Sequence, residues 1–105
     1  MFVTFEEAYL RDLYEKGKTD DKNHRYQPDV IRRYRRCVQL MKNVADISSL
    51  LKYNSLNYEM LKGNKKGISS IRVNNKYRIE FAVRDSMEEP IVTVCNIIEL
   101  SNHYK

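Results

Sequence analysis

The hydrophobic residues of this 105-residue chain change their period near residue 58, and this change restricts the fold more than any other feature. Before it, apolar side chains recur every three to four positions, as on one face of a helix. After it, they alternate with polar side chains, as in a half-buried strand. Helices followed by strands predict an α+β fold, and the length suits one domain over residues 1–105.

Two helices are expected in the first half of the chain, after a short strand at residues 1–5. Residues 6–16 are rich in helix formers, and Gly17 follows them as it often follows a helix. A second helix starts at Pro28, a residue favoured in the first helical turn. The residues expected on its buried face are Val30, Tyr34, Cys37, Val38, Met41, Val44 and Ala45. Residues 48–53 can add a helical turn.

The second half of the chain predicts a small sheet. Strands are expected at residues 58–62, 68–73, 77–83 and 91–98. The last of these is apolar on both faces, which is typical of a central strand. Residues 99–105 are expected to form a tail, with His103 and Tyr104 at the C-terminal end of the sheet.

The hydrophobic pattern selects the register of the hairpin between the second and third of these strands. A two-residue loop at 74–75 would pair Ile71 with Arg78 and mix apolar and charged side chains on both faces. A three-residue loop pairs Ile71 with Ile79, and Arg72 with Arg78, which leaves one face apolar and the other polar. Because a shift of one residue turns every side chain over, we expect the three-residue loop, with one of its asparagines in the left-handed conformation.

Positive charge is concentrated on this hairpin and on the turn before it. Between residues 62 and 84, seven basic residues face a single acid, Glu80, and this local excess is larger than the net charge of +5 on the whole chain. The basic residues are Lys62, Lys65, Lys66, Arg72, Lys76, Arg78 and Arg84. Such a concentration favours an anionic partner. The simpler alternative is a solvated edge strand protected by lysines.

Further arginines lie on the second predicted helix. Arg32, Arg33 and Arg36 fall outside its apolar face, with Arg35 at the margin. A solvated outer face is the simpler explanation for them. The alternative is a second basic surface for a nucleic acid or an acidic protein.

The expected register places Arg72 beside Arg78 on the solvent-facing side of the sheet. Like charges directly opposite each other destabilise a sheet by up to about 1 kcal/mol. A phosphate held between the two guanidinium groups would offset that repulsion, unless Glu80 bridges them instead. The lysines of residues 62–66 can close such a site, which predicts a concave basic surface that binds a phosphate backbone.

RNA carries its own nucleophile, the 2′-hydroxyl beside each phosphodiester, so a protein can cleave it without a metal. Arg72 and Arg78 would stabilise the charged phosphorane. Lys62 is the candidate general base, because neighbouring cations lower the pKa of a lysine. Tyr77 or His103 would stack on a base or protonate the leaving oxygen. Tyr77 can do so only from the rim of the sheet, since the expected register turns it toward the core.

The sequence gives little support for a disulfide framework, a metal site or a membrane location. Cys37 and Cys95 are too few and too far apart for a disulfide framework or a zinc site, and they are expected to be buried thiols in a reducing cytoplasm. No metal or cofactor is expected. The chain shows no apolar signal segment and no run of membrane-spanning length.

Three segments together resemble a known family. Leu-Lys-Gly-Asn-Lys-Lys-Gly at 61–67, Ser-Ile-Arg-Val-Asn at 70–74 and Tyr-Arg-Ile at 77–79 resemble the HigB branch of the RelE/ParE toxin superfamily. The resemblance implies a RelE-like α+β fold, with N-terminal helices packed on a small antiparallel or mixed sheet. It also implies a toxin that cleaves mRNA in the ribosome and is neutralised by a helix-turn-helix antitoxin in a hetero-oligomer.

The resemblance also implies site residues. Lys62 and Arg78 match basic active-site positions, while Arg72 and Tyr77 match recurrent motif residues. HigB toxins often end in Asp-Tyr-His, and here Glu99 takes the place of the acid, with His103 or Tyr104 as the terminal group. The remaining cations of the hairpin region are expected to bind RNA; they are Lys65, Lys66, Lys76 and Arg84.

Two other functions stay open at this point. One is a ParE-like inhibitor of DNA gyrase, which needs no nuclease chemistry. The other is a family member that binds RNA or its antitoxin without turnover, which the altered C-terminal residues would permit.

Overall fold

The predicted hairpin lies at the centre of the sheet in the computed structural model, which describes residues 1–102. Strands β3 (Ile68–Arg72) and β4 (Tyr77–Asp85) pair with Ile71 opposite Ile79 and Arg72 opposite Arg78. The three-residue loop is therefore confirmed, and the hydrophobic pattern did select the register.

The loop closes differently from our expectation. The side-chain oxygen of Asn74 accepts hydrogen bonds from the backbone nitrogens of Lys76 (2.9 Å) and Tyr77 (2.8 Å). With the turn fixed in this way, neither loop asparagine takes the left-handed conformation, and that prediction was wrong. Within residues 1–102, Asn57 is the non-glycine residue with positive φ, at 43°.

The sheet has five strands in the order β1-β5-β4-β3-β2. Strand β1 (Phe2–Phe5) runs parallel to β5 (Thr93–Asn102), and the remaining pairs, which include the short β2 (Glu59–Met60), are antiparallel. The sheet is therefore mixed, and β5 is a central strand as predicted. It is longer than predicted, because a bulge opposite Glu80 and Phe81 lets it continue through residues that we expected to be a tail.

Both predicted helices are present. Helix α1 (Ala8–Lys16) ends at Gly17, whose φ of 75° suits glycine and whose N–H bonds back to Leu13 O at 3.2 Å. Helix α2 (Pro28–Asn43) buries the predicted apolar residues as far as Met41. Ala45 is exposed, because α2 ends two residues before it.

Short helical segments connect α2 to the sheet. Asp46 caps α3 (Ile47–Leu50) by accepting a hydrogen bond from Ser49 N at 2.9 Å. Two 3-10 turns follow, η1 (Asn54–Leu56) and η2 (Gly63–Lys65). The second turn lies in the basic segment before β3.

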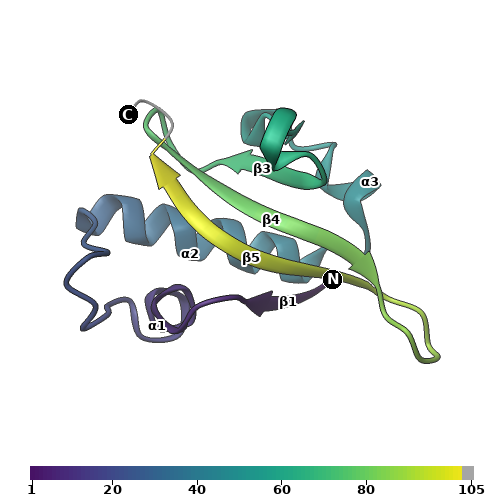
Figure 1. Cartoon of the computed structure of the whole chain (residues 1–105), viewed down its shortest axis with the longest axis horizontal. Coiled ribbons are helices and arrows are strands. Elements are labelled where there is room, and N and C mark those ends of the chain that lie inside the picture. Colours follow the sequence, from purple (N-terminus) through teal and green to yellow (C-terminus); the bar gives the residue numbers. More distant parts are fainter. Residues whose placement is uncertain (103–105) are drawn as a thin grey trace.

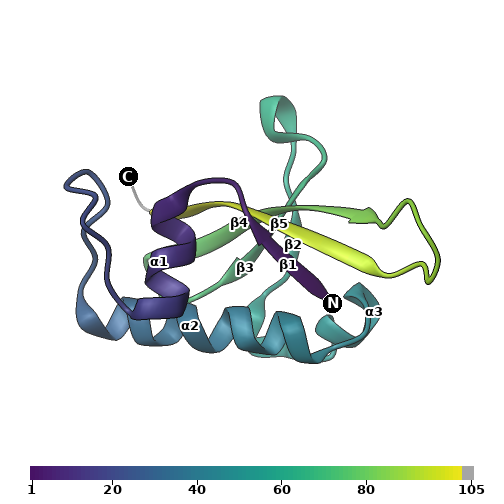
Figure 2. The ribbon, with the colours of Figure 1, turned by 90° about the horizontal axis from the view of Figure 1, so that it is seen from below.

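The elements form two layers. Helix α2 crosses behind the sheet in Figure 1, and α1 lies beside β1 and β5. Figure 2 shows both helices on one side of the sheet, while the connection between β2 and β3 rises from the other side. We call the side without helices the open face.

The core lies between the sheet and the helices. Its fully buried side chains include Leu10, Tyr34, Met41, Ile79 and Phe81. Both cysteines are buried free thiols, as predicted, and burial raises the pKa of each to about 11. Among the described helices, none is long and apolar enough to cross a membrane.

Candidate functional site

The open face of the sheet carries the polar side chains of four neighbouring strands. Since Ile71, Ile79 and Phe81 point into the core, the alternating positions point to the open face. These residues are Glu59 on β2, Ser70 and Arg72 on β3, Arg78 and Glu80 on β4, and Glu99 on β5. The predicted site residues Arg78 and Glu99 therefore share this face.

Arg78 is held rigidly in the middle of the sheet and is only 7% exposed. Its Nε donates to Ser70 Oγ at 2.5 Å, and its Nη2 donates to Asn57 O at 2.5 Å and to Ser70 O at 3.2 Å. Asn57 adopts its positive φ two residues before β2 begins, and its carbonyl accepts from the guanidinium there. A buried arginine with these partners is a fixed positive charge, not a flexible surface cation.

Glu59 is the acid nearest to this charge and was not among the predicted site residues. Its Oε1 lies 3.9 Å from Arg78 Nη2, and its side chain is 53% exposed. The signal in the sequence was its position three residues before Lys62. Its pairing with Ser70 is seen only in the structure. The structure thus places an accessible carboxylate beside a buried guanidinium.

Glu80 does not bridge the two arginines of the hairpin. Both oxygens of its carboxylate accept hydrogen bonds from Lys65 Nζ, which lies 3.0 Å from Oε1 and 3.1 Å from Oε2. Glu80 is 12% exposed at its side chain, and its cross-strand partner on β5 is Glu99. Lys65 therefore neutralises one of two adjacent carboxylates, and it is committed to this ion pair in the structure.

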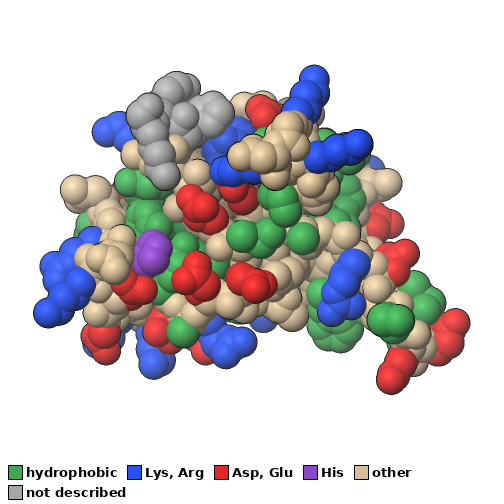
Figure 3. All heavy atoms as spheres, viewed as in Figure 1, with side chains coloured by type: hydrophobic (Ala, Val, Ile, Leu, Met, Phe, Trp, Pro, Cys, Tyr) green, Lys and Arg blue, Asp and Glu red, His purple; other side chains and the backbone are tan. Residues whose placement is uncertain are grey.

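The open face is not the uniformly basic surface that we expected. In Figure 3, acidic side chains gather across its middle, while lysines and arginines stand at its margins. The sequence count missed this because Glu59 and Glu99 lie outside residues 62–84, yet the sheet brings both beside the hairpin.

The side chains of Arg72 and Tyr77 have partners other than Arg78. The expected pairing of Arg72 with Arg78 is present, but Nη2 of Arg72 donates to Asn75 Oδ1 at the end of the hairpin. Tyr77 packs on the helix side of the sheet, edge-on to Tyr26 with ring centroids 5.4 Å apart. Because β-strand side chains alternate, Tyr77 cannot act at the same face as Arg78.

The other predicted cations are spread over the molecule. Lys62 and Lys66 are exposed at either end of η2, and Lys76 is exposed at the tip of the hairpin. Arg84 is exposed near the far end of β4, opposite Val94. His103 and Tyr104 lie outside the described residues.

The other histidine, His24, lies in the connection between α1 and α2. The ring of His24 stacks on Tyr9 with centroids 3.6 Å apart, and its Nδ1 is 3.0 Å from Asp21 Oδ2. Over residues 1–102, no group of three or more histidine, cysteine or acidic residues is arranged to hold a metal ion.

Comparisons with known proteins identify the family. A family model described as the RelE-like toxin HigB of type II toxin–antitoxin systems matches residues 3–93. The chain belongs to the HigB-like toxins. Toxin HigB-1 of Vibrio cholerae is 38% identical to this HigB-like toxin over 84 residues, which cover 77% of this chain and 82% of the relative.

Solved structures confirm the RelE-like α+β fold. The YoeB/ParE toxin from Agrobacterium tumefaciens superposes with a TM-score of 0.59 at 17% identity, over 99% of this HigB-like toxin and 100% of that chain. The YoeB dimer from Staphylococcus aureus gives 0.55 at 20% identity, over 99% and 98% of the two chains. The S. aureus YoeB–YefM toxin–antitoxin complex gives 0.53 at 19% identity, with the same coverage.

Proposed function

We propose that this HigB-like toxin is an endoribonuclease that cleaves mRNA on the ribosome, without a metal, through the RNA 2′-hydroxyl. The pairing of Arg78 with Glu59 carries this proposal. Cleavage by the 2′-hydroxyl needs a base that takes its proton and a cation that stabilises the charge on the phosphorane. The open face offers both groups within 4 Å of each other.

Arg78 is suited to the electrostatic role because its orientation is fixed before substrate binds. Its bonds to Ser70 and Asn57 hold the guanidinium in place through Nε and Nη2. Nη1 is then the nitrogen that meets the phosphate. A preorganised donor of this kind costs no reorganisation when charge develops in the transition state.

We assign proton abstraction to Glu59 and keep Lys62 as the alternative base. Carboxylates are generally ionised at neutral pH, whereas lysines are generally protonated. Glu59 is also more than half exposed, so RNA can approach it. Lys62, two residues beyond β2, would then contribute positive charge, and Glu99, His103 or Tyr104 would supply the general acid.

We further propose that a helix-turn-helix antitoxin neutralises this HigB-like toxin in a hetero-oligomer. A related YoeB toxin forms a complex with its antitoxin YefM, which supports an antitoxin partner for this chain. The ribosome is proposed as the second partner because it presents single-stranded mRNA in a fixed position.

The decisive experiment incubates the purified protein with a defined mRNA, with and without programmed 70S ribosomes, and maps the new 3′ ends by primer extension. We expect cuts at A-site codons only when ribosomes are present. Arg78→Ala should abolish them while ribosome binding persists. Arg11→Ala is the control, because it removes the same group from an exposed position on α1.

A gyrase inhibitor is the second candidate, since one structural neighbour is described as a YoeB/ParE toxin. Absence of cuts with or without ribosomes, together with inhibition of DNA supercoiling, would replace the nuclease proposal by this one. Absence of both effects, with RNA binding retained, would indicate a family member that binds without turnover.

A further inference from the structure

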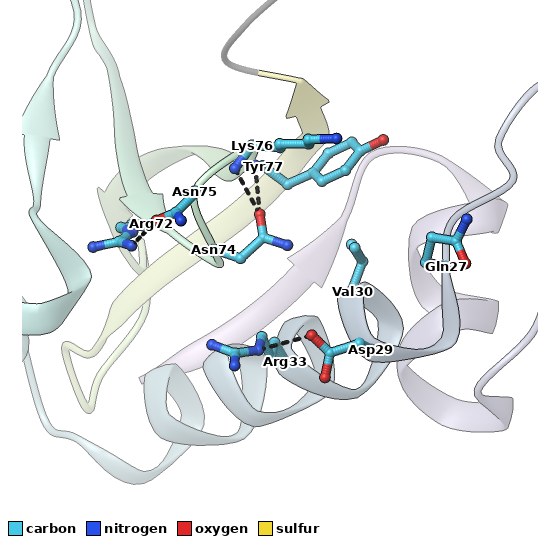
Figure 4. A pocket seen from close by; sticks show the side chains of 9 residues that line it. All are labelled: Gln27, Asp29, Val30, Arg33, Arg72, Asn74, Asn75, Lys76 and Tyr77. Carbon is cyan, nitrogen blue, oxygen red and sulfur yellow. Dashed lines mark hydrogen bonds and ion pairs between the residues drawn. The ribbon is translucent and has the colours of Figure 1, made fainter.

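A groove separates α2 from the tip of the β3–β4 hairpin, and Arg72, the cross-strand partner of Arg78, is among the residues that line it. Its wider part is a hollow of about 780 Å³ between the start of α2 and the hairpin loop, as Figure 4 shows. A second hollow of about 330 Å³ continues it toward η1. The two share Arg33, Arg72 and Asn74, so they form one elongated groove.

The groove is lined by four cations and one acid. Arg33 and Arg36 come from α2, Arg72 from the end of β3, and Lys76 from the hairpin tip. The acid is Asp29, which lies 3.1 Å from Arg33 Nε and also pairs with Arg32. Residues that are more than 30 positions apart in the sequence thus build a strongly positive surface together.

We propose that this groove binds the phosphate backbone of an RNA strand, as a second RNA-binding surface that docks the toxin while the open face acts on the mRNA. The inference rests on the proposed function, because it assumes that the protein meets RNA. An elongated groove with three guanidinium forks suits a chain of phosphates better than a single anion.

Neighbouring side chains favour RNA over an acidic peptide. The ring of Tyr77 lines the wider hollow, where a base can stack on it. The oxygen of Asn74 is turned toward the loop backbone, so its amide nitrogen lies on the groove side (Figure 4) and can donate to a base or ribose. Gln27 adds a second amide at the start of α2.

Asp29 restrains the groove in the absence of a ligand. Hydrogen bonding from Arg32, with the charge of Arg33, lowers the pKa of the Asp29 carboxyl, which keeps it negatively charged. A phosphate must therefore compete with this carboxylate for Arg33. Removal of the acid should strengthen RNA binding, an effect opposite to that of removing an arginine.

The test measures binding of a fluorescein-labelled, 2′-O-methylated single-stranded RNA by anisotropy over a range of salt concentrations. This probe cannot be cut through a 2′-hydroxyl, so binding is observed whether or not the protein is a nuclease. Arg33→Ala and Arg36→Ala should each weaken binding severalfold and reduce the salt slope by about 0.7 per lost phosphate contact. Asp29→Asn should raise the affinity.

Arg32→Ala is the matched control. Arg32 and Arg33 are neighbours on α2, are 54% and 49% exposed and share Asp29, but Arg33 lines the groove and Arg32 does not. We expect Arg32→Ala to bind the probe with the salt slope of the wild type. Alanine is favourable in helices, so these variants should fold.

Cosedimentation of the same variants with programmed 70S ribosomes shows whether the groove binds ribosomal RNA or free RNA. If Arg33→Ala and Arg36→Ala lose only ribosome binding, the groove binds structured RNA of the ribosome. If they lose only binding of the probe, the groove binds free single strands. Equal behaviour of Arg33→Ala, Arg36→Ala and Arg32→Ala in both arms would overturn the inference. A defect confined to antitoxin binding would also overturn it.

The experiments can refute the groove proposal and the nuclease proposal separately, because each predicts a different result. If Arg33→Ala loses RNA affinity but the wild type cuts no mRNA, the groove stands and the nuclease proposal falls. If the wild type cuts mRNA and Arg33→Ala binds and cuts equally well, the nuclease stands and the groove falls.

Discussion

Lys65 reaches from the turn before β3 to Glu80 in the middle of β4, and its Nζ contacts both carboxylate oxygens at 3.0 and 3.1 Å. Glu80 is nearly buried and has Glu99 as its cross-strand neighbour. Without Lys65, two carboxylates would repel each other on the central strands of the sheet. A residue that the motif suggests for RNA binding therefore also stabilises the fold.

We expect Lys65→Ala to lower the free energy of unfolding by about 1–2 kcal/mol, because it leaves a nearly buried carboxylate without its cation. Lys66→Ala, one residue along the same turn, should change it by less than about 0.5 kcal/mol. Urea denaturation followed by circular dichroism measures both values. Equal stabilities would show that the ion pair contributes nothing measurable.

Glu59→Gln should reduce the rate of mRNA cleavage by about 10²-fold or more, since it removes the proposed base while keeping the size of the side chain. Ribosome binding should persist. Glu88→Gln in the exposed β4–β5 turn serves as the control for the loss of one negative charge. If Lys62→Ala abolishes the rise of the cleavage rate with pH and Glu59→Gln leaves the rate intact, Lys62 is the base.

Asn74→Ala should destabilise the hairpin by about 1 kcal/mol, because two backbone N–H groups lose their acceptor. Asn75→Ala removes one contact with Arg72 and should cost less. Thermal unfolding of the two variants provides the comparison. A larger loss for Asn75→Ala would mean that the arginine contact, not the asparagine turn, fixes the loop.

Alkaline pH should unfold the protein through its buried tyrosines. Burial raises the pKa of Tyr9 to about 12, and it also raises the pKa values of Tyr26 and Tyr34. A raised folded-state pKa means that the stabilisation is complete below about pH 10 and is lost as the pH rises through the folded-state value.

Phenolate absorbance and circular dichroism, recorded in one titration, test this prediction. Part of the phenolate signal should rise only when the dichroism signal is lost. In denaturant, all tyrosines should ionise together. Complete ionisation of a protein that is still folded would contradict the assignment.

The sequence predicted those parts of the fold that depend on local pattern. The register of the hairpin followed from placing Ile71 opposite Ile79, and the end of α1 followed from Gly17. The length of β5 did not follow, because a bulge opposite Glu80 depends on pairing with β4, which local pattern does not contain.

The candidate site was predicted only in part. The pattern placed Arg72 and Arg78 opposite each other but said nothing of their side-chain partners, which come from residues 57, 70 and 75. Glu59 was not predicted as a site residue, because its role depends on β2 lying beside β3, and β2 has only two residues. Short strands carry almost no periodic signal.

The parallel pairing of β1 with β5 has a consequence for biosynthesis. Phe2 lies opposite Val94, so the first strand cannot find its place until almost the whole polypeptide has been translated. Contacts between such distant positions form late, because the chain loses the entropy of closing a long loop before the strand pairing can stabilise it. The nascent toxin is thus expected to remain incomplete until its own translation ends, and an antitoxin present in the cell has that interval in which to meet it.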